Sequence, residues 1–221
     1  MGKVIESDTA IATMMFNRTN SVHYRSEHRI FSSKDAIVRI GFAETRNLVL
    51  GMSVVNKFGV DTKNLGFQRA YIWTHTLTVA SIANLLARYS RTLKPDIAFV
   101  AGLVHDLGKL SFDGFLHHDY EMTTEAQAKQ HISLARTERE RFGINHTDMG
   151  QILIEKYRFP KDLINVATYH HAFRDSEHEM DPASHPMIKL IHAANALAKA
   201  YRLGNSGDEI LSPYRTIFWI N

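Results

Sequence analysis

Histidines on the apolar faces of predicted helices constrain this chain more than any other feature of its sequence. Across residues 67–91, apolar side chains recur every three or four positions, and His75 lies on the same stripe. This spacing places side chains on one face of an α-helix. A helix that turns an imidazole toward its core leaves a polar group there that needs a partner.

The same periodicity continues along most of the chain. Only five prolines occur in 221 residues, and the alternation typical of strands is hard to find. The sequence therefore predicts an all-α fold, a multi-helix bundle. Helices are expected over residues 8–16, 33–58, 67–91, 95–107, 121–141, 146–157, 160–173 and 184–203.

Four further predicted helices carry polar residues on their apolar stripes. These are His105 and Asp106 in 95–107, His146 in 146–157, His170 and His171 in 160–173, and Asn195 in 184–203. Gly108 is expected to stop the helix of Asp106, and Asn145 is expected to cap the helix of His146. Five helices thus direct polar side chains toward one interior.

A shared metal ion explains this set better than separate core histidines. A single histidine on an apolar stripe is more often a hydrogen-bonded core residue than a ligand, and the neighbours His117 and His118 are expected at the surface. Several buried and unpartnered polar groups would cost about 1–3 kcal/mol each. Imidazole and carboxylate ligands without thiolate suit Fe, Mn, Zn, Ni or Co, with Mg also a candidate. The chain has no cysteine, which excludes zinc–thiolate sites and disulfides.

Composition and charge indicate an ordinary globular chain, 44% hydrophobic and 22% charged, with a formal net charge of +3. The charges are spread out, and Arg136, Arg139 and Arg141 alternate with Glu138 and Glu140 as on a solvated helix face. A nucleic-acid partner is therefore not expected. No apolar run approaches the roughly 18 residues of a spanning helix, and the first residues lack a signal-peptide layout. We expect no membrane association and a cytoplasmic location.

The polar, turn-like segment Gly59–Gly66 is the one candidate boundary. It predicts a small N-terminal helical lobe over residues 1–60 and a larger helical bundle over residues 61–221. The bundle would contain all the candidate ligands.

Four motifs resemble the HD superfamily of metal-dependent phosphohydrolases: WTHTLTVA, AGLVHDLGKL, NHTDMG and ATYHHAF. The stretch from NRTNSVHY to VVNKFG is similar to the helical lobe that precedes the HD core in the HDOD subgroup of bacterial signalling domains. The stretch from ERERFGINH to ATYHH is similar to the later half of that subgroup. The resemblance covers the chain from Ile5 to about Leu203.

The resemblance implies a set of metal ligands, with Asp106 as a bridging carboxylate. The implied ligands are His75, His105, Asp106, His146, His170 and His171, and the family's last aspartate corresponds to Asn195. A neutral amide is a poorer ligand than a carboxylate, so the half-site of His75, His105, Asp106 and Asn195 is expected to be weakened. The half-site of Asp106, His146, His170 and His171 is complete, which predicts one tight metal rather than two. Alternatively, Asn195 is a core amide bonded to a neighbouring helix.

Asp106 and Lys109 are the candidate catalytic residues. Lys109 stands in HDLGK, a form similar to that of the HD-GYP phosphodiesterases for cyclic dinucleotides, where the lysine contacts a phosphate. Alternatively, Lys109 is a surface cation at a helix end. The GYP signature is absent after His171, where the sequence runs AFRDSEHEM, and this argues against cyclic di-GMP hydrolysis.

Two interpretations of function follow from the resemblance. In the first, the chain is a signalling or regulatory module that binds a divalent metal and acts on a signalling protein or a small phosphorylated ligand. In the second, it is an active metal-dependent phosphohydrolase for a phosphate ester or nucleotide, since a divalent ion activates water and polarises phosphoryl oxygens.

Overall fold

The chain was analysed in a computed structural model that describes residues 19, 32–42, 45, 49, 67–130, 132–171 and 184–208. Within these residues every regular element is a helix and none is a strand, which confirms the predicted all-α fold. The chain divides into two compact units, residues 1–57 and 58–221. The predicted helix over 8–16 lies outside the described residues.

The first unit contains α3 (Ser33–Ile40), which begins at a capping residue. The Ser32 side chain accepts a hydrogen bond from the Asp35 amide, as an N-cap does. Gly41 follows the helix with a φ of 92°, a conformation that favours glycine.

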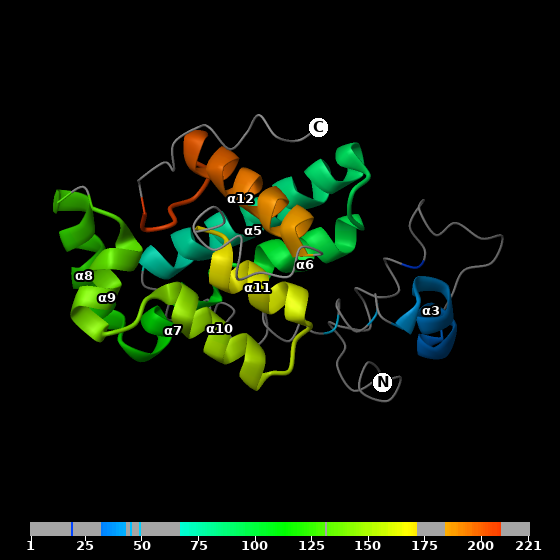
Figure 1. Ribbon diagram of the computed structural model, residues 1–221, viewed down its shortest axis with the longest axis horizontal. Helices are drawn as coiled ribbons and strands as arrows, with labels where there is room; N and C mark the ends of the chain where they lie inside the picture. The colour runs from blue at the N-terminus through cyan, green and yellow to red at the C-terminus, as the bar shows by residue number, and fades with distance from the viewer. Residues whose placement is uncertain are drawn as a thin grey trace. The chain divides into compact units, whose positions relative to one another are not determined.

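The second unit is a bundle of eight described helices (Figure 1). They are α5 (Phe67–Ser90), α6 (Pro95–Val104), α7 (Leu107–Phe115), α8 (His117–Gln130), α9 (Leu134–Phe142), α10 (His146–Lys156), α11 (Lys161–Tyr169) and α12 (His185–Ala200). None of the described helices combines the length and apolar character needed to cross a bilayer.

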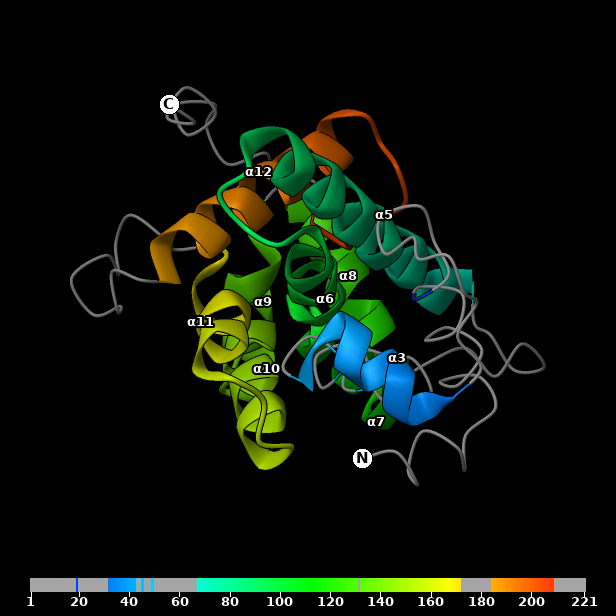
Figure 2. The ribbon, with the colours of Figure 1, turned by 90° about the vertical axis from the view of Figure 1, so that its right-hand side faces the viewer.

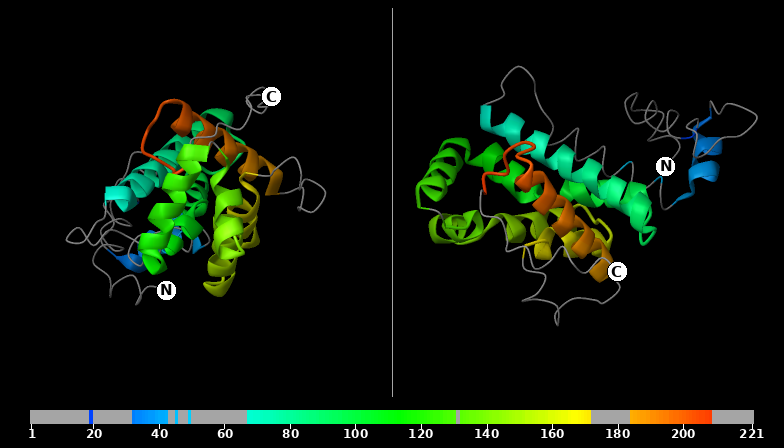
Figure 3. Two further views of the ribbon diagram at one scale, coloured as in Figure 1. Left: turned by 90° about the vertical axis from the view of Figure 1, so that its left-hand side faces the viewer. Right: turned by 90° about the horizontal axis from the view of Figure 1, so that it is seen from above.

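Helix α5 packs against both α6 and α12, and α10 packs against both α7 and α11 (Figures 2 and 3). The contact of α5 with α6 is close because both helices present small residues. A methyl group added at Gly102 would overlap the backbone of Ala80. The candidate ligands lie on or next to helices of both sets, α5 with α6 and α12, and α10 with α7 and α11. The packing of these helices therefore determines the distances between the ligand side chains.

Several helix boundaries differ from the sequence expectation. The helix expected over 33–58 was wrong in extent, because α3 ends at Ile40 and Gly41 follows it with a positive φ. The helix that starts at Pro95 ends at Val104, and a turn at His105 and Asp106 leads directly into α7. Gly108 does not stop a helix, because it lies inside α7, where a methyl group would overlap the His146 carbonyl oxygen. The expectation of one helix over 121–141 was also wrong, since Ser133 starts a new helix by capping α9.

Candidate metal centre

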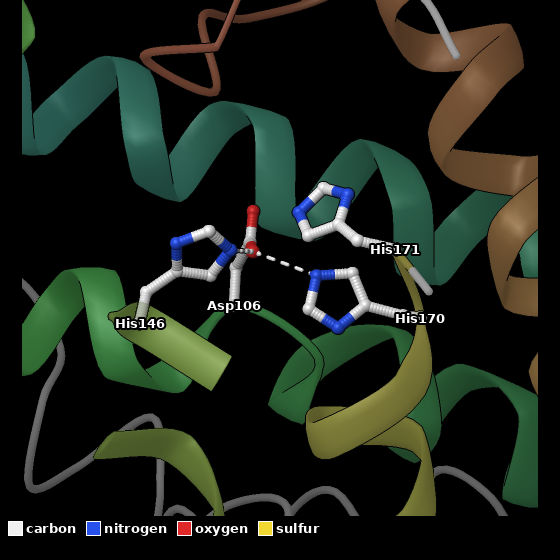
Figure 4. Close-up of side chains that lie close together, drawn as sticks. All are labelled: Asp106, His146, His170 and His171. Carbon is white, nitrogen blue, oxygen red and sulfur yellow. Dashed lines mark ion pairs between the residues drawn. The ribbon is translucent and has the colours of Figure 1, made fainter. Parts of the chain in front are cut away.

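The predicted ligands of the bundle converge on the turn between α6 and α7. His105 follows α6, Asp106 precedes α7, His146 is the first residue of α10, and His170 and His171 follow α11. Figure 4 shows the side chains of His146, His170 and His171 directed toward the Asp106 carboxylate. The four side chains His105, Asp106, His146 and His170 are fully buried.

The position of His146 depends on a well-formed start of α10. Asn145 accepts hydrogen bonds from the amides of Thr147 and Asp148, and Asp148 accepts one from the Asn145 amide. This reciprocal arrangement is a capping box, and it confirms the predicted cap at Asn145. It fixes the first turn of the helix and with it the backbone of His146.

Three histidines use Nδ1 to bind an acceptor, which leaves Nε2 for the centre. His105 Nδ1 lies 2.7 Å from the Gly102 carbonyl oxygen, and His170 Nδ1 lies 3.1 Å from the carbonyl oxygens of Val166 and Ala167. His146 Nδ1 lies 2.6 Å from a carboxylate oxygen of Glu138. Because each partner only accepts, each Nδ1 carries a hydrogen, and in a neutral imidazole Nε2 then carries the lone pair.

These lone pairs face the Asp106 carboxylate. His105 Nε2 lies 3.2 Å from Asp106 Oδ2, and His170 Nε2 and His146 Nε2 lie 3.3 and 3.8 Å from Asp106 Oδ1. None of the three nitrogens makes a hydrogen bond in the described part of the chain, and neither do Asp106 Oδ1 and His171 Nε2. A divalent cation between these facing atoms would satisfy them together.

The donor atoms form two groups that suit a divalent ion. In the first group Asp106, His146, His170 and His171 each offer one atom, and all four atoms lie within 4.8 Å of one another. The second group is His75, His105 and Asp106. Three imidazoles and one carboxylate are borderline ligands that match Zn, Mn or Fe. The first group therefore fits the predicted metal in number, type and spacing.

Three histidines near the Asp106 carboxylate, His75, His170 and His171, have lowered pKa values, which favours their neutral form. Burial, opposed by Asp106, lowers the pKa of His75 to about 3, and burial lowers the pKa of His170 to about 3 as well. Burial also lowers the pKa of His171 well below its ordinary value. Burial alone would raise the pKa of Asp106, but His105 and Lys109 outweigh it and hold that pKa well below its ordinary value. A carboxylate among neutral imidazoles is the state that a metal ion binds.

The second group differs from the first because Asn195 already engages His75. Asn195 Oδ1 on α12 lies 3.0 Å from His75 Nε2 on α5, and both side chains are buried. The nitrogen that would ligate an ion in this group therefore has a hydrogen-bond partner from the chain. His75 Nε2 also lies 3.9 Å from Asp106 Oδ2, close enough to belong to the centre.

Lys109 belongs to the centre and is not a surface cation. Its side chain is fully buried, and Nζ donates to Asp106 Oδ2 at 2.9 Å and to the Ser206 carbonyl oxygen at 3.0 Å. Gly204, in the same segment as Ser206, has a φ of 79° and lies so close to His75 that a methyl group there would overlap the His75 backbone. The segment after α12 thus closes over the Asp106 side of the centre.

Glu138 and Tyr120 are part of the site, although the sequence pattern placed Glu138 on a solvated face. Glu138 is fully buried on α9, in contact with His146 as described above, and Tyr120 donates to its other oxygen at 2.8 Å. The expectation for Glu138 was wrong because its arginine neighbours suggested exposure. A signal was present in the spacing of Leu134, Glu138 and Phe142, which recur every four residues as on one helix face. His117 is half-exposed and His118 is exposed, as expected.

A cavity of about 440 Å³ adjoins the centre at His75. Two basic residues, Lys199 and Arg202, line it, together with Ser206 and Asp208. Lys199 is mostly buried, and its Nζ donates to Asp208 at 2.9 Å. The cavity therefore places Arg202 and the Lys199–Asp208 ion pair close to the candidate ligands.

Known proteins share this sequence and fold in part. The chain is 23% identical to an uncharacterized protein of Treponema pallidum over 87% of its own length and 36% of that protein. It is 30% identical to ribonuclease Y of Aquifex aeolicus over 62% of its own length and 19% of that protein. The chain thus spans only about a third and a fifth of these relatives.

Two solved structures show the same fold. An HDOD domain protein of unknown function from Geobacter sulfurreducens has a TM-score of 0.71 at 24% identity, covering 97% of this chain and 70% of that one. A candidate phosphohydrolase from Shewanella amazonensis has a TM-score of 0.68 at 23% identity, covering 91% of this chain and 69% of that one. The HDOD domain family matches residues 1–173, which include the candidate ligands from His75 to His171. The chain belongs to the HDOD family.

Proposed function

We propose that this chain is a signalling module that binds one divalent ion through Asp106, His146, His170 and His171 and thereby recognises a small phosphorylated ligand. The observation that carries the proposal is the set of unpartnered Nε2 atoms that face the Asp106 carboxylate in a fully buried space. When bound, the ion would supply a Lewis-acidic contact for a phosphoryl oxygen.

The cavity at His75 supports a phosphorylated ligand. Arg202 would attract an anion, whereas the ammonium groups of Lys199 and Lys109 are paired with Asp208 and Asp106. The volume of about 440 Å³ suits a small molecule rather than a polymer.

Hydrolysis of a phosphate ester is the second candidate. The retained ligand group and the similarity to ribonuclease Y over 139 residues favour it. The engagement of His75 by Asn195 favours recognition without turnover, because it occupies a donor of the second metal group.

Metal analysis and a ligand panel test both candidates. Purified protein is dialysed against Mn, Fe or Zn, and the bound metal is counted per chain. The same samples are then titrated calorimetrically with phosphomonoesters, nucleotides, cyclic dinucleotides and a short RNA, and released products are measured. One metal with metal-dependent binding and no turnover supports the module. Turnover supports the second candidate, and a chain that retains no metal contradicts both.

A further inference from the structure

We propose that Glu138 and Tyr120 are positioning residues that determine which nitrogen of His146 faces the metal position. The inference rests on the metal site of the proposed function, but it concerns side chains outside the ligand group. Both residues are fully buried, Glu138 on α9 and Tyr120 on α8.

Glu138 binds His146 twice through one oxygen. Its Oε2 accepts from the His146 backbone amide at 2.8 Å and from His146 Nδ1 at 2.6 Å. The first bond anchors the start of α10, and the second places the hydrogen on Nδ1. The lone pair of Nε2 is thereby directed at Asp106 Oδ1, 3.8 Å away.

The acceptor at Nδ1 of His146 is a carboxylate, which distinguishes His146 from His105 and His170. His105 and His170 bind backbone carbonyl oxygens, which are neutral acceptors. A carboxylate behind a ligating imidazole raises its basicity as well as fixing its tautomer, and removal of such a partner typically weakens metal binding about 10–100-fold. Glu138 therefore makes His146 a stronger ligand than the other two.

Tyr120 holds the Glu138 carboxylate in place. Its hydroxyl donates to Glu138 Oε1 at 2.8 Å, and burial, with the nearby Glu138, raises the pKa of Tyr120 well above its ordinary value, so the hydroxyl keeps its hydrogen. The Tyr120 ring stacks on Phe112, with ring centroids 5.5 Å apart. The packing of its ring thus holds Tyr120 in position, and the Tyr120 hydroxyl in turn holds the Glu138 carboxylate.

The arginines of α9 do not neutralise Glu138. They form ion pairs elsewhere in the described structure: Arg136 with Glu140, Arg139 with Asp148 and Arg141 with Asp119. In the described structure Glu138 contacts Tyr120 and His146, so the charge that complements its carboxylate lies beyond the imidazole, at the metal position. This arrangement couples the charge of Glu138 to the ion.

The decisive variant is Glu138→Gln, which keeps the size of the side chain and removes its charge. We expect its dissociation constant for Zn, measured by competition with a chromophoric chelator, to rise about 10–100-fold. Glu140→Gln is the matched control, because Glu140 lies on the same helix, is exposed and forms an ion pair with Arg136. It should bind Zn as the parent protein does.

Nitrogen NMR of the metal-free protein gives a readout that a general loss of packing would not move. In the parent protein His146 should show a protonated Nδ1 and an unprotonated Nε2. Glu138→Gln should increase the share of the other tautomer, and Tyr120→Phe, which keeps the carboxylate, should do so to a smaller extent. Tyr120→Phe also decides the question if Glu138→Gln fails to fold.

Unchanged zinc affinity together with an unchanged His146 tautomer in Glu138→Gln would overturn the inference. If the parent protein binds no metal at all, the proposed function fails, but the tautomer shift in the metal-free protein still decides the role of Glu138. The two failures are therefore distinguishable.

Discussion

Asp106 is the side chain on which the centre converges. Oδ2 accepts from Lys109 at 2.9 Å, while Oδ1 faces His170 and His146 and makes no hydrogen bond. One carboxylate thus compensates a buried ammonium group and faces the metal position at the same time. Removal of this carboxylate would leave Lys109 without its counter-charge and would take the negative charge away from the metal position.

Asp106→Asn should abolish metal binding and destabilise the metal-free bundle. The amide leaves the Lys109 ammonium group buried without its counter-charge, which typically costs about 3–5 kcal/mol. Urea unfolding in the presence of a chelator measures this loss. Asp106→Asn combined with Lys109→Met should recover much of the stability but none of the metal binding. A double variant as unstable as the single one would contradict the buried ion pair.

Asn195→Asp should raise the metal content from one ion per chain toward two. A carboxylate at 195 brings charge and a second oxygen to the group of His75, His105 and Asp106, where the amide now only bonds His75. Elemental analysis of protein loaded with Mn or Zn gives the ratio, and Asn195→Ala is the control. A ratio that stays at one, with a lower melting temperature, would show that position 195 is a core amide only.

The sequence predicted the candidate ligands but not the residues that contact them from behind. His75, His105, His146 and His170 were visible because an imidazole on an apolar stripe departs from the helical pattern. Glu138 was missed because it lies among exposed arginines, and the packing of α9 against Tyr120 shows that Glu138 is on the buried side of the helix. The bond from Asn195 to His75 joins residues 120 positions apart, which no local pattern encodes.

At the scale of elements, the contact between α7 and α10 brings Asp106 and His146 together. Gly108 makes that contact possible, because α7 lies against the His146 carbonyl oxygen with no room for a methyl group. The sequence predicted the helices of His75 and His146 well, but it missed α7. A glycine after an Asp-Leu pair resembles a helix stop, and only the tertiary contact explains why a helix contains it.

Gly108→Ala should weaken metal binding strongly, whereas Gly143→Ala should not. Overpacking at Gly108 typically costs about 1–3 kcal/mol and pushes α10 away from Asp106. Gly143 has a φ of 78° and open space around it, so alanine there adds a backbone strain of about 1–2 kcal/mol and no displacement. If the two variants have similar melting temperatures, a difference in their zinc dissociation constants reports the displacement of α10 and not a general loss of stability. Equal affinities would show that the α7–α10 spacing does not control the centre.

At the scale of the whole molecule, a bound ion would link segments that are far apart in the sequence. Donors come from the turn after α6, the start of α10 and the end of α11, so a bound ion stabilises the assembled bundle. The unit of residues 58–221 contains all of these donors.

Chelation should lower the unfolding free energy of the bundle by about 4 kcal/mol when the free metal had been a thousand-fold above its dissociation constant. Thermal unfolding with and without a chelator measures the shift, and added metal should restore it. The Asp106→Asn, Lys109→Met variant is the control and should not respond. A parent protein that unfolds at the same temperature in both conditions would contradict a native metal site.

The spread of the donors over separate helices also bears on how fast the bundle forms and decays. Asp106, His146 and His170 come from three separate helix junctions and lie close together in the folded bundle. We therefore expect the ion to bind after the folding barrier has been crossed. Stopped-flow measurements should show slower unfolding with metal and an almost unchanged folding rate. The ion would then set the lifetime of the folded chain and leave the time it takes to fold unaffected.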